Sequence, residues 1–120
     1  MELFAQNGAF VYANAREPGC IDSYCNELTD KYSTCVCPVY FDVTNNDALR
    51  DCFVKINKEH KRLDILVNNA GVMRDALIGM ISTNMMNEVF SVNVFAVISM
   101  IQYATKLMAK NKSGSIINLS

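Results

Sequence analysis

The stretch Asp64-Ile65-Leu66-Val67-Asn68-Asn69-Ala70-Gly71 constrains the fold of this chain more than any other. Its apolar part, residues 65–67, is a short run rich in β-branched side chains, typical of a strand buried on both faces in a parallel sheet. The run ends on residue types that favour a turn and let another group approach the backbone. Because ligands of open α/β sheets bind beyond the carboxyl ends of the strands, this turn is a candidate site. Taken alone, it also fits an ordinary strand-ending turn.

Strand and helix patterns alternate along the rest of the chain, which predicts βαβ units and a parallel sheet. The segment Thr44-Asn45-Asn46 precedes one of the expected helices as a cap, and either Ser82 or Thr83 caps another. Gly8 is placed to end the first helix. Besides the strand of the opening stretch, strands are expected over residues 10–15, 36–41 and 115–119, and helices over 2–7, 20–31, 47–59 and 83–110.

Length and composition predict one globular domain. The chain has 120 residues, and 51% of them are hydrophobic. A net charge of -1 gives no basic footprint for nucleic acid, no apolar run approaches a membrane span, and no basic leader opens the chain. The five cysteines show no zinc spacing, and unpaired thiols are typical of a reducing compartment. We therefore expect a cytoplasmic protein without a nucleic-acid, membrane or metal partner.

The chain resembles the short-chain dehydrogenases/reductases over nearly its whole length. Residues 64–71 match the family's D-[IV]-L-V-N-N-A-G signature, and Gly114-Ser115-Ile116-Ile117-Asn118-Leu119-Ser120 matches the strand that leads to the catalytic serine. The segment Arg74-Asp75-Ala76-Leu77 looks most like the bacterial 3-oxoacyl-(acyl-carrier-protein) reductase branch. The resemblance implies a Rossmann-like, doubly wound parallel sheet and hydride transfer between NADP(H) and a carbonyl substrate. The resemblance to the reductase branch implies a 3-oxoacyl thioester on acyl carrier protein as that substrate.

The resemblance also implies which residues bind the cofactor. Arg16 stands at the position that binds the 2′-phosphate of NADP in the family. An acidic residue at the tip of the strand before it would select NAD, and this chain has none there. The side chain of Asp42 would meet the adenine amino group, helped by the backbone of Val43. Arg16 could equally be a solvated loop residue beside Glu17, and Asp42 an ordinary helix-leading acid. The backbone would line the ribose at Asn69, Ala70 and Gly71.

Asn93 matches the asparagine of the family's Asn-Ser-Tyr-Lys tetrad, which holds a water in the proton relay. From the residues alone, it would be a core amide with satisfied hydrogen bonds. Ser120 fills the first of two serine positions, of which the family uses the second, and the chain contains no matching Tyr-x-x-x-Lys pair or glycine-rich phosphate turn. We therefore expect residues 1–120 to be an internal fragment, a partial NAD(P)-binding domain that is inactive alone.

In the family's strand order, 3-2-1-4-5, this chain lacks the first strand. The strands at 10–15 and 36–41 should still pair, as should those at Ile65 and at 115–119. The helix over 83–110 is apolar nearly all round between Val89 and Ile101, so we expect two covered faces, one of them by a partner subunit. The resemblance implies a homo-oligomer formed through this helix. The alternative function is a non-catalytic α/β module that binds a nucleotide or a partner.

Overall fold

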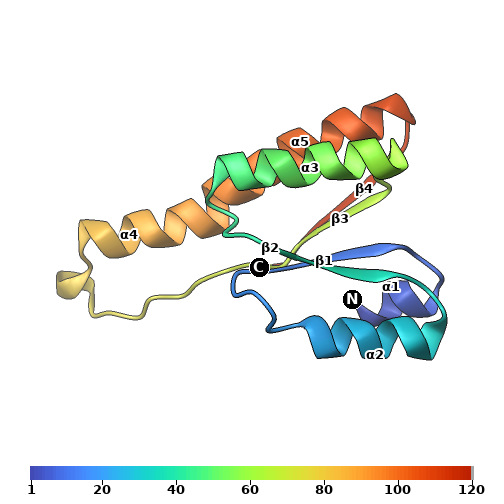
Figure 1. Ribbon diagram of the computed structural model, residues 1–120. Coiled ribbons are helices and arrows are strands. Elements are labelled where there is room, and N and C mark those ends of the chain that lie inside the picture. Colours follow the sequence, from blue (N-terminus) through green and yellow to red (C-terminus); the bar gives the residue numbers. More distant parts are fainter. Residues whose placement is uncertain (120) are drawn as a thin grey trace. The chain divides into compact units, whose positions relative to one another are not determined.

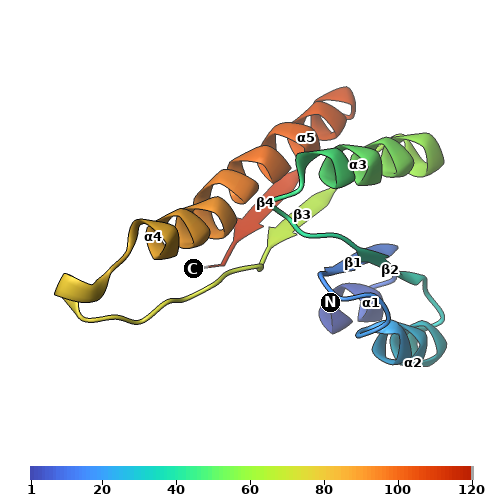
Figure 2. The ribbon, with the colours of Figure 1, turned by 60° about the vertical axis from the view of Figure 1, so that its left-hand side comes forward.

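The computed structural model describes residues 1–119 and forms two compact units, Met1–Asp42 and Val43–Ser120. Each unit contains one pair of parallel strands with helices packed on it (Figures 1 and 2). The two expected strand pairs are therefore confirmed, and the α/β class with them. Each of the two strand pairs has buried apolar residues of its own.

The first unit contains α1 (Glu2–Gln6), β1 (Val11–Ala15), α2 (Asp22–Tyr32) and β2 (Val36–Tyr40). Strand β1 pairs with β2 in register, from Val11 opposite Val36 to Ala15 opposite Tyr40. Gly8 adopts φ 77° after α1, the left-handed conformation that the sequence predicts for a helix end. The core of this unit consists of Ala5, Ala13, Cys25, Leu28 and Val36.

A carboxylate on α1 fastens that short helix to α2. The Glu2 carboxylate accepts a hydrogen bond of 2.7 Å from the Tyr32 hydroxyl and one of 2.9 Å from the Lys31 ammonium. These bonds lower the pKa of Glu2, with the Tyr32 hydroxyl as the largest cause. A helix of five residues is too short to persist by itself, so this contact and the burial of Ala5 hold α1 in place.

The second unit contains α3 (Asn46–His60), β3 (Ile65–Asn68), a long interrupted helix and β4 (Ser115–Asn118). Strand β3 pairs with β4, from Ile65 opposite Ser115 to Asn68 opposite Asn118. Asn45 caps α3, accepting hydrogen bonds from two backbone N–H groups, as its position predicts. The core contains Leu49, Phe53, Ile56, Leu66, Ala96, Ala104, Leu107 and Met108.

The long helix consists of α4 (Thr83–Phe90), a π-helical segment η2 (Ser91–Ala96) and α5 (Val97–Lys110), and Ser82 caps it as expected. A 3₁₀ turn, η1 (Ile78–Met80), precedes it. Side by side, α3 and α5 cover one side of the β3–β4 pair (Figures 1 and 2). The π-helical turn was not predicted, because the spacing of apolar residues does not distinguish it from an α-helix.

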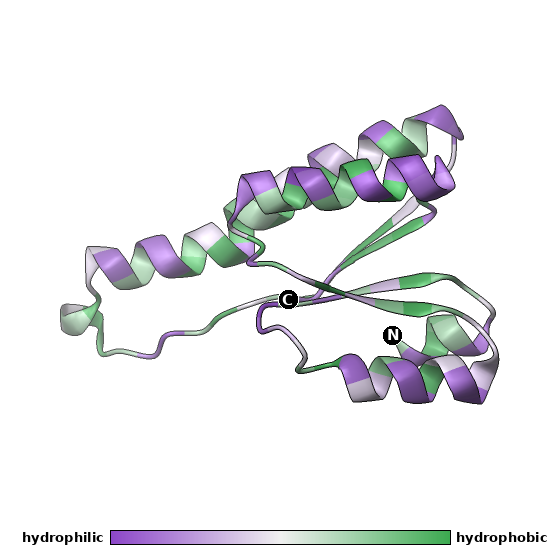
Figure 3. Ribbon diagram, in the orientation of Figure 1, coloured by the Kyte–Doolittle hydropathy of each residue, from purple (hydrophilic) through white to green (hydrophobic). Residues whose placement is uncertain are grey.

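One expectation about burial is wrong within this chain. Ile65 is 40% exposed, so β3 is covered on one face instead of two. The face of the long helix that was expected to meet a partner subunit carries exposed apolar side chains in this single chain, and the apolar residues of the helix are green in Figure 3. These exposed residues include Phe90, Val94, Phe95 and Ile98.

The helix Thr83–Lys110 is also long and apolar enough to cross a membrane, by length and composition alone. This corrects the expectation that no segment of the chain would meet that criterion. One such helix is a weak indication, because the core helix of a soluble protein meets the same criterion. Here α5 contributes Ala104, Leu107 and Met108 to the core of its unit.

Candidate functional site

The Asn-Asn-Ala-Gly turn begins at the carboxyl end of β3, where a buried asparagine joins the two strands. Asn68 is 7% exposed, and its amide nitrogen donates a hydrogen bond of 2.8 Å to the side-chain oxygen of Asn118 on β4. The backbone N–H of Leu119 donates to the Asn68 carbonyl at 3.0 Å. Asn68 therefore braces the neighbouring strand. Beyond it, residues 69–71 are exposed, so their backbone is open to a ligand.

The side chain of Asn93 holds the backbone directly after this turn. Its oxygen accepts a hydrogen bond of 2.9 Å from the Val72 N–H, and its nitrogen donates one of 2.8 Å to the Val72 carbonyl. A Cβ placed on Gly71 would lie 3.6 Å from the Asn93 oxygen, an ordinary contact. The interpretation of Asn93 as a core amide is wrong in one respect, because this side chain is exposed, although its hydrogen bonds are satisfied.

Asn93 lies within the π-helical segment η2. A π-helical turn accommodates more residues than an α-helical one and occurs frequently at functional sites. The segment and the bond to Val72 together distinguish Asn93 from its apolar neighbours. A poor helix former within an apolar helical run was the only signal that the sequence carried.

Sequence reasoning missed the ion pair that fastens the loop after the turn to the long helix. The Arg74 Nε donates a hydrogen bond of 2.8 Å to one carboxylate oxygen of Glu88, and a second guanidinium nitrogen donates to the other. This two-point pairing raises the pKa of Arg74. The partners are 14 residues apart, and no local pattern predicts such a pair.

Arg16 and Asp42 both follow strands of the first unit, and the register of β1 and β2 brings them to the same carboxyl edge. Both are exposed. Asn14 braces this edge: its side-chain nitrogen donates to the Phe41 carbonyl at 3.4 Å, and its oxygen accepts from the Phe41 N–H at 3.3 Å. Sequence reasoning missed this brace.

The remaining predicted residues belong to the second unit. Val43 opens that unit and is half-buried, and the exposed residues 69–71 lie beside Asn93. Arg16 and Asp42 therefore lie at the carboxyl edge of the β1–β2 pair, and residues 69–71 and Asn93 lie at that of the β3–β4 pair. Over residues 1–119, no three His, Cys, Asp or Glu side chains converge as metal ligands would. The predicted Ser120 lies outside the described residues.

Parallel strand pairs with helices packed on them, and with exposed loops at their carboxyl edges, define a partial Rossmann-like fold. The chain belongs to the short-chain dehydrogenase family, because the family model described as "short chain dehydrogenase" matches residues 1–120.

Known proteins of this family resemble the chain over almost its full length. It is 35% identical over 118 residues to the 3-oxoacyl-[acyl-carrier-protein] reductase FabG of Thermotoga maritima, covering 98% of the chain and 48% of that relative. It is 34% identical to the 7alpha-hydroxysteroid dehydrogenase of Paraclostridium sordellii, covering 97% and 44%. The crystal structure of YwfH, an NADPH dependent reductase involved in bacilysin biosynthesis, superimposes with a TM-score of 0.89 at 26% identity, covering 98% and 46%. The chain thus spans about half the length of the curated relatives it matches.

Proposed function

We propose that this chain forms part of an NADP(H)-dependent reductase of carbonyl compounds, with 3-oxoacyl thioesters on acyl carrier protein as its substrate class. The observation that carries the proposal is the two-point contact between Asn93 and Val72, which fixes the Asn-Asn-Ala-Gly turn. The name of the 35%-identical Thermotoga maritima relative supports the substrate class. The 34%-identical relative is named as a hydroxysteroid dehydrogenase, so the 3-oxoacyl substrate is a narrower proposal than carbonyl reduction itself.

The chemistry of the proposed cofactor-binding residues suits a dinucleotide with a 2′-phosphate. In this proposal the Arg16 guanidinium binds that phosphate, and no carboxylate at the end of β1 opposes it. Asp42 accepts a hydrogen bond from the adenine amino group, Val43 contributes its backbone, and the backbone of residues 69–71 lines the ribose. The bound cofactor supplies the hydride.

Asn93 acts on the proton relay by holding one water. Its side-chain oxygen accepts one hydrogen bond from Val72 and one amide N–H donates another, so the water is held by the second lone pair of that oxygen, by the remaining amide N–H or by the backbone carbonyl. General acid catalysis contributes about 10²–10⁴-fold to such reactions. The chain of 120 residues has no Tyr-x-x-x-Lys pair to supply the acid, so we expect it to be inactive alone.

The proposed assembly is a homo-oligomer formed through α4, η2 and α5. Phe90 and Phe95 are 52% and 59% exposed, and their ring centroids lie 6.4 Å apart. An apolar surface of this kind on a helix is typical of a protein–protein contact. Replacing Phe95 with Glu should shift the sedimentation coefficient toward that of the monomer, and an unchanged coefficient would exclude this face. Five free thiols fit the proposed cytoplasmic location.

A chimeric enzyme tests the proposed activity. Residues 1–120 would replace the matching part of the Thermotoga maritima relative, whose own flanking segments complete the chain. We expect carbonyl-dependent oxidation of NADPH, and a loss of about tenfold or more in kcat on Asn93→Ala. Arg16→Asp should raise KM for NADPH and leave the NADH reaction as the internal control. A chimera that folds and binds NADPH but reduces no carbonyl compound would overturn the proposed activity. An unchanged KM for NADPH in the Arg16→Asp variant would overturn the proposed role of Arg16.

A further inference from the structure

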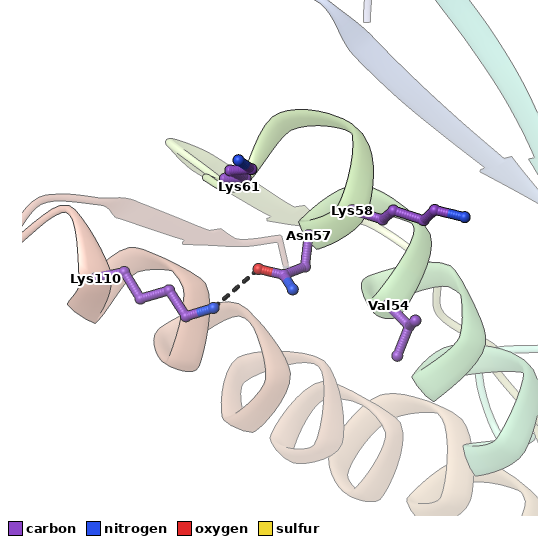
Figure 4. A pocket seen from close by; sticks show the side chains of 5 residues that line it. All are labelled: Val54, Asn57, Lys58, Lys61 and Lys110. Carbon is purple, nitrogen blue, oxygen red and sulfur yellow. Dashed lines mark hydrogen bonds between the residues drawn. The ribbon is translucent and has the colours of Figure 1, made fainter.

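The carboxyl-terminal ends of α3 and α5 lie side by side in the second unit and border an open hollow of about 640 Å³ (Figure 4). We propose that this hollow binds a small anion rich in phosphate groups. The proposal does not depend on the reductase function. The residues lining the hollow are Val54, Asn57, Lys58, Lys61 and Lys110.

The hollow lies at the opposite edge of the strands from the candidate cofactor site. Residue Lys61 follows α3 and precedes β3, and Lys110 ends α5 and precedes β4, so both lie toward the amino ends of these strands. The Asn-Asn-Ala-Gly turn follows the carboxyl end of β3. A ligand in the hollow would therefore not be the dinucleotide proposed above.

Three of the five residues that line this hollow are lysines, and none of the five carries a carboxylate. The Lys110 ammonium donates a hydrogen bond of 2.9 Å to the side-chain oxygen of Asn57, which is a neutral acceptor (Figure 4). Across residues 1–119, neither Lys58, Lys61 nor Lys110 forms an ion pair. The nearby Asp64 is already paired with Arg62. The hollow is thus locally cationic, although the whole chain has a net charge of -1.

The position of Lys61 is unfavourable for a lysine by itself. Its backbone has φ 59°, a left-handed conformation in which glycine or asparagine is preferred, and its N–H donates to the Asn57 carbonyl at 3.0 Å to end α3. A lysine in the last turn complements the helix dipole, and this explains Lys58 and Lys110. It does not explain why the residue that ends the helix is also a lysine. Ser33 and Lys112 adopt the same left-handed conformation, with φ 50° and 52°, so the case for Lys61 depends on its place in the lining of the hollow.

The chemistry of the lining favours a small phosphate-rich anion over a larger partner. Lysine binds phosphate as a compact point charge, and the volume is in the range of small-molecule sites. Val54 is the only large apolar side chain among the lining residues, and none is aromatic. A nucleic acid would use stacking surfaces and a membrane would use an apolar rim. The carbonyl ends of two helices oppose an anion, so we expect weak binding, with Kd about 0.1–1 mM at low salt.

Inorganic tripolyphosphate is the probe, titrated into the 120-residue chain at about 20 mM ionic strength and pH 7 by calorimetry. The matched pair of variants is Lys110→Gln and Lys106→Gln, on the same helix one turn apart. Lys106 lies over the Tyr103 ring and does not line the hollow. We expect Lys110→Gln to weaken binding about fivefold and Lys106→Gln less than twofold. Raising the ionic strength to about 200 mM should weaken binding at least tenfold.

Lys61→Gly separates binding from folding. Glycine suits the left-handed backbone of this position, so the variant should unfold at a higher temperature while it binds tripolyphosphate more weakly. Absence of tripolyphosphate binding by the folded chain would overturn the proposal, as would equal losses from Lys106→Gln and Lys110→Gln or undiminished binding by Lys61→Gly. Tighter binding of single-stranded RNA or of anionic lipid vesicles, lost in the same variants, would also overturn it in favour of a larger partner.

Discussion

Replacing Asn93 with alanine should release the backbone at Val72. The substitution removes two hydrogen bonds, of 2.9 and 2.8 Å, that join residues 21 positions apart in the sequence. A net hydrogen bond contributes about 0.5–1.5 kcal/mol, so the pair contributes about 2 kcal/mol. Alanine is the better helix former and returns roughly 0.6 kcal/mol within the long helix. The expected net loss of stability is therefore about 1.4 kcal/mol.

Amide hydrogen exchange of the chain, followed residue by residue by NMR, measures this effect where it occurs. The Val72 amide should exchange about tenfold faster in Asn93→Ala, because 1.4 kcal/mol is a factor of ten in an equilibrium constant. Asn87→Ala is the matched control, since it makes the same change at an exposed position of α4. If exchange at Val72 is unchanged, or if Asn87→Ala accelerates it equally, Asn93 does not hold the turn.

Further measurements test other parts of the structure. A Cβ on Gly114 would overlap the Met108 side chain and lie 2.8 Å from its Cβ, so Gly114→Ala should lower the free energy of unfolding in urea by about 1–3 kcal/mol. The Tyr32 hydroxyl lowers the pKa of Glu2 below its ordinary 4.5, so the carboxylate stabilises the fold above pH 4.5 and this contribution is lost as the pH falls through the lower, folded-state value. The Glu2→Gln variant should accordingly lose less stability than the parent chain on acidification. Burial raises the pKa of Cys25, so iodoacetamide should modify this thiol more slowly than the exposed ones by mass spectrometry, and equal rates would contradict its place in the core.

The sequence by itself determined the order and type of the elements and the family. Alternation of apolar runs with amphipathic segments is a local property, so it predicted the four strands and the principal helices to within a few residues. Capping chemistry is equally local, and Asn45, Ser82 and Gly8 occupy the helix ends for which their side chains or backbone suit them. The pairing of the strands followed from the family order, because removal of one strand leaves two pairs intact.

Only the tertiary structure decided how distant residues meet. Three side-chain contacts join residues far apart in the sequence. They are the hydrogen bonds of Asn93 with Val72 (21 positions apart), Arg74 with Glu88 (14 positions) and Lys110 with Asn57 (53 positions). Such contacts depend on strand register and on how one helix packs against another, which apolar periodicity leaves open. For the same reason, apolar periodicity does not show which face of the long helix stays exposed. It does not predict the π-helical turn either. An apolar side chain shows the same pattern whether its own chain covers it or leaves it exposed.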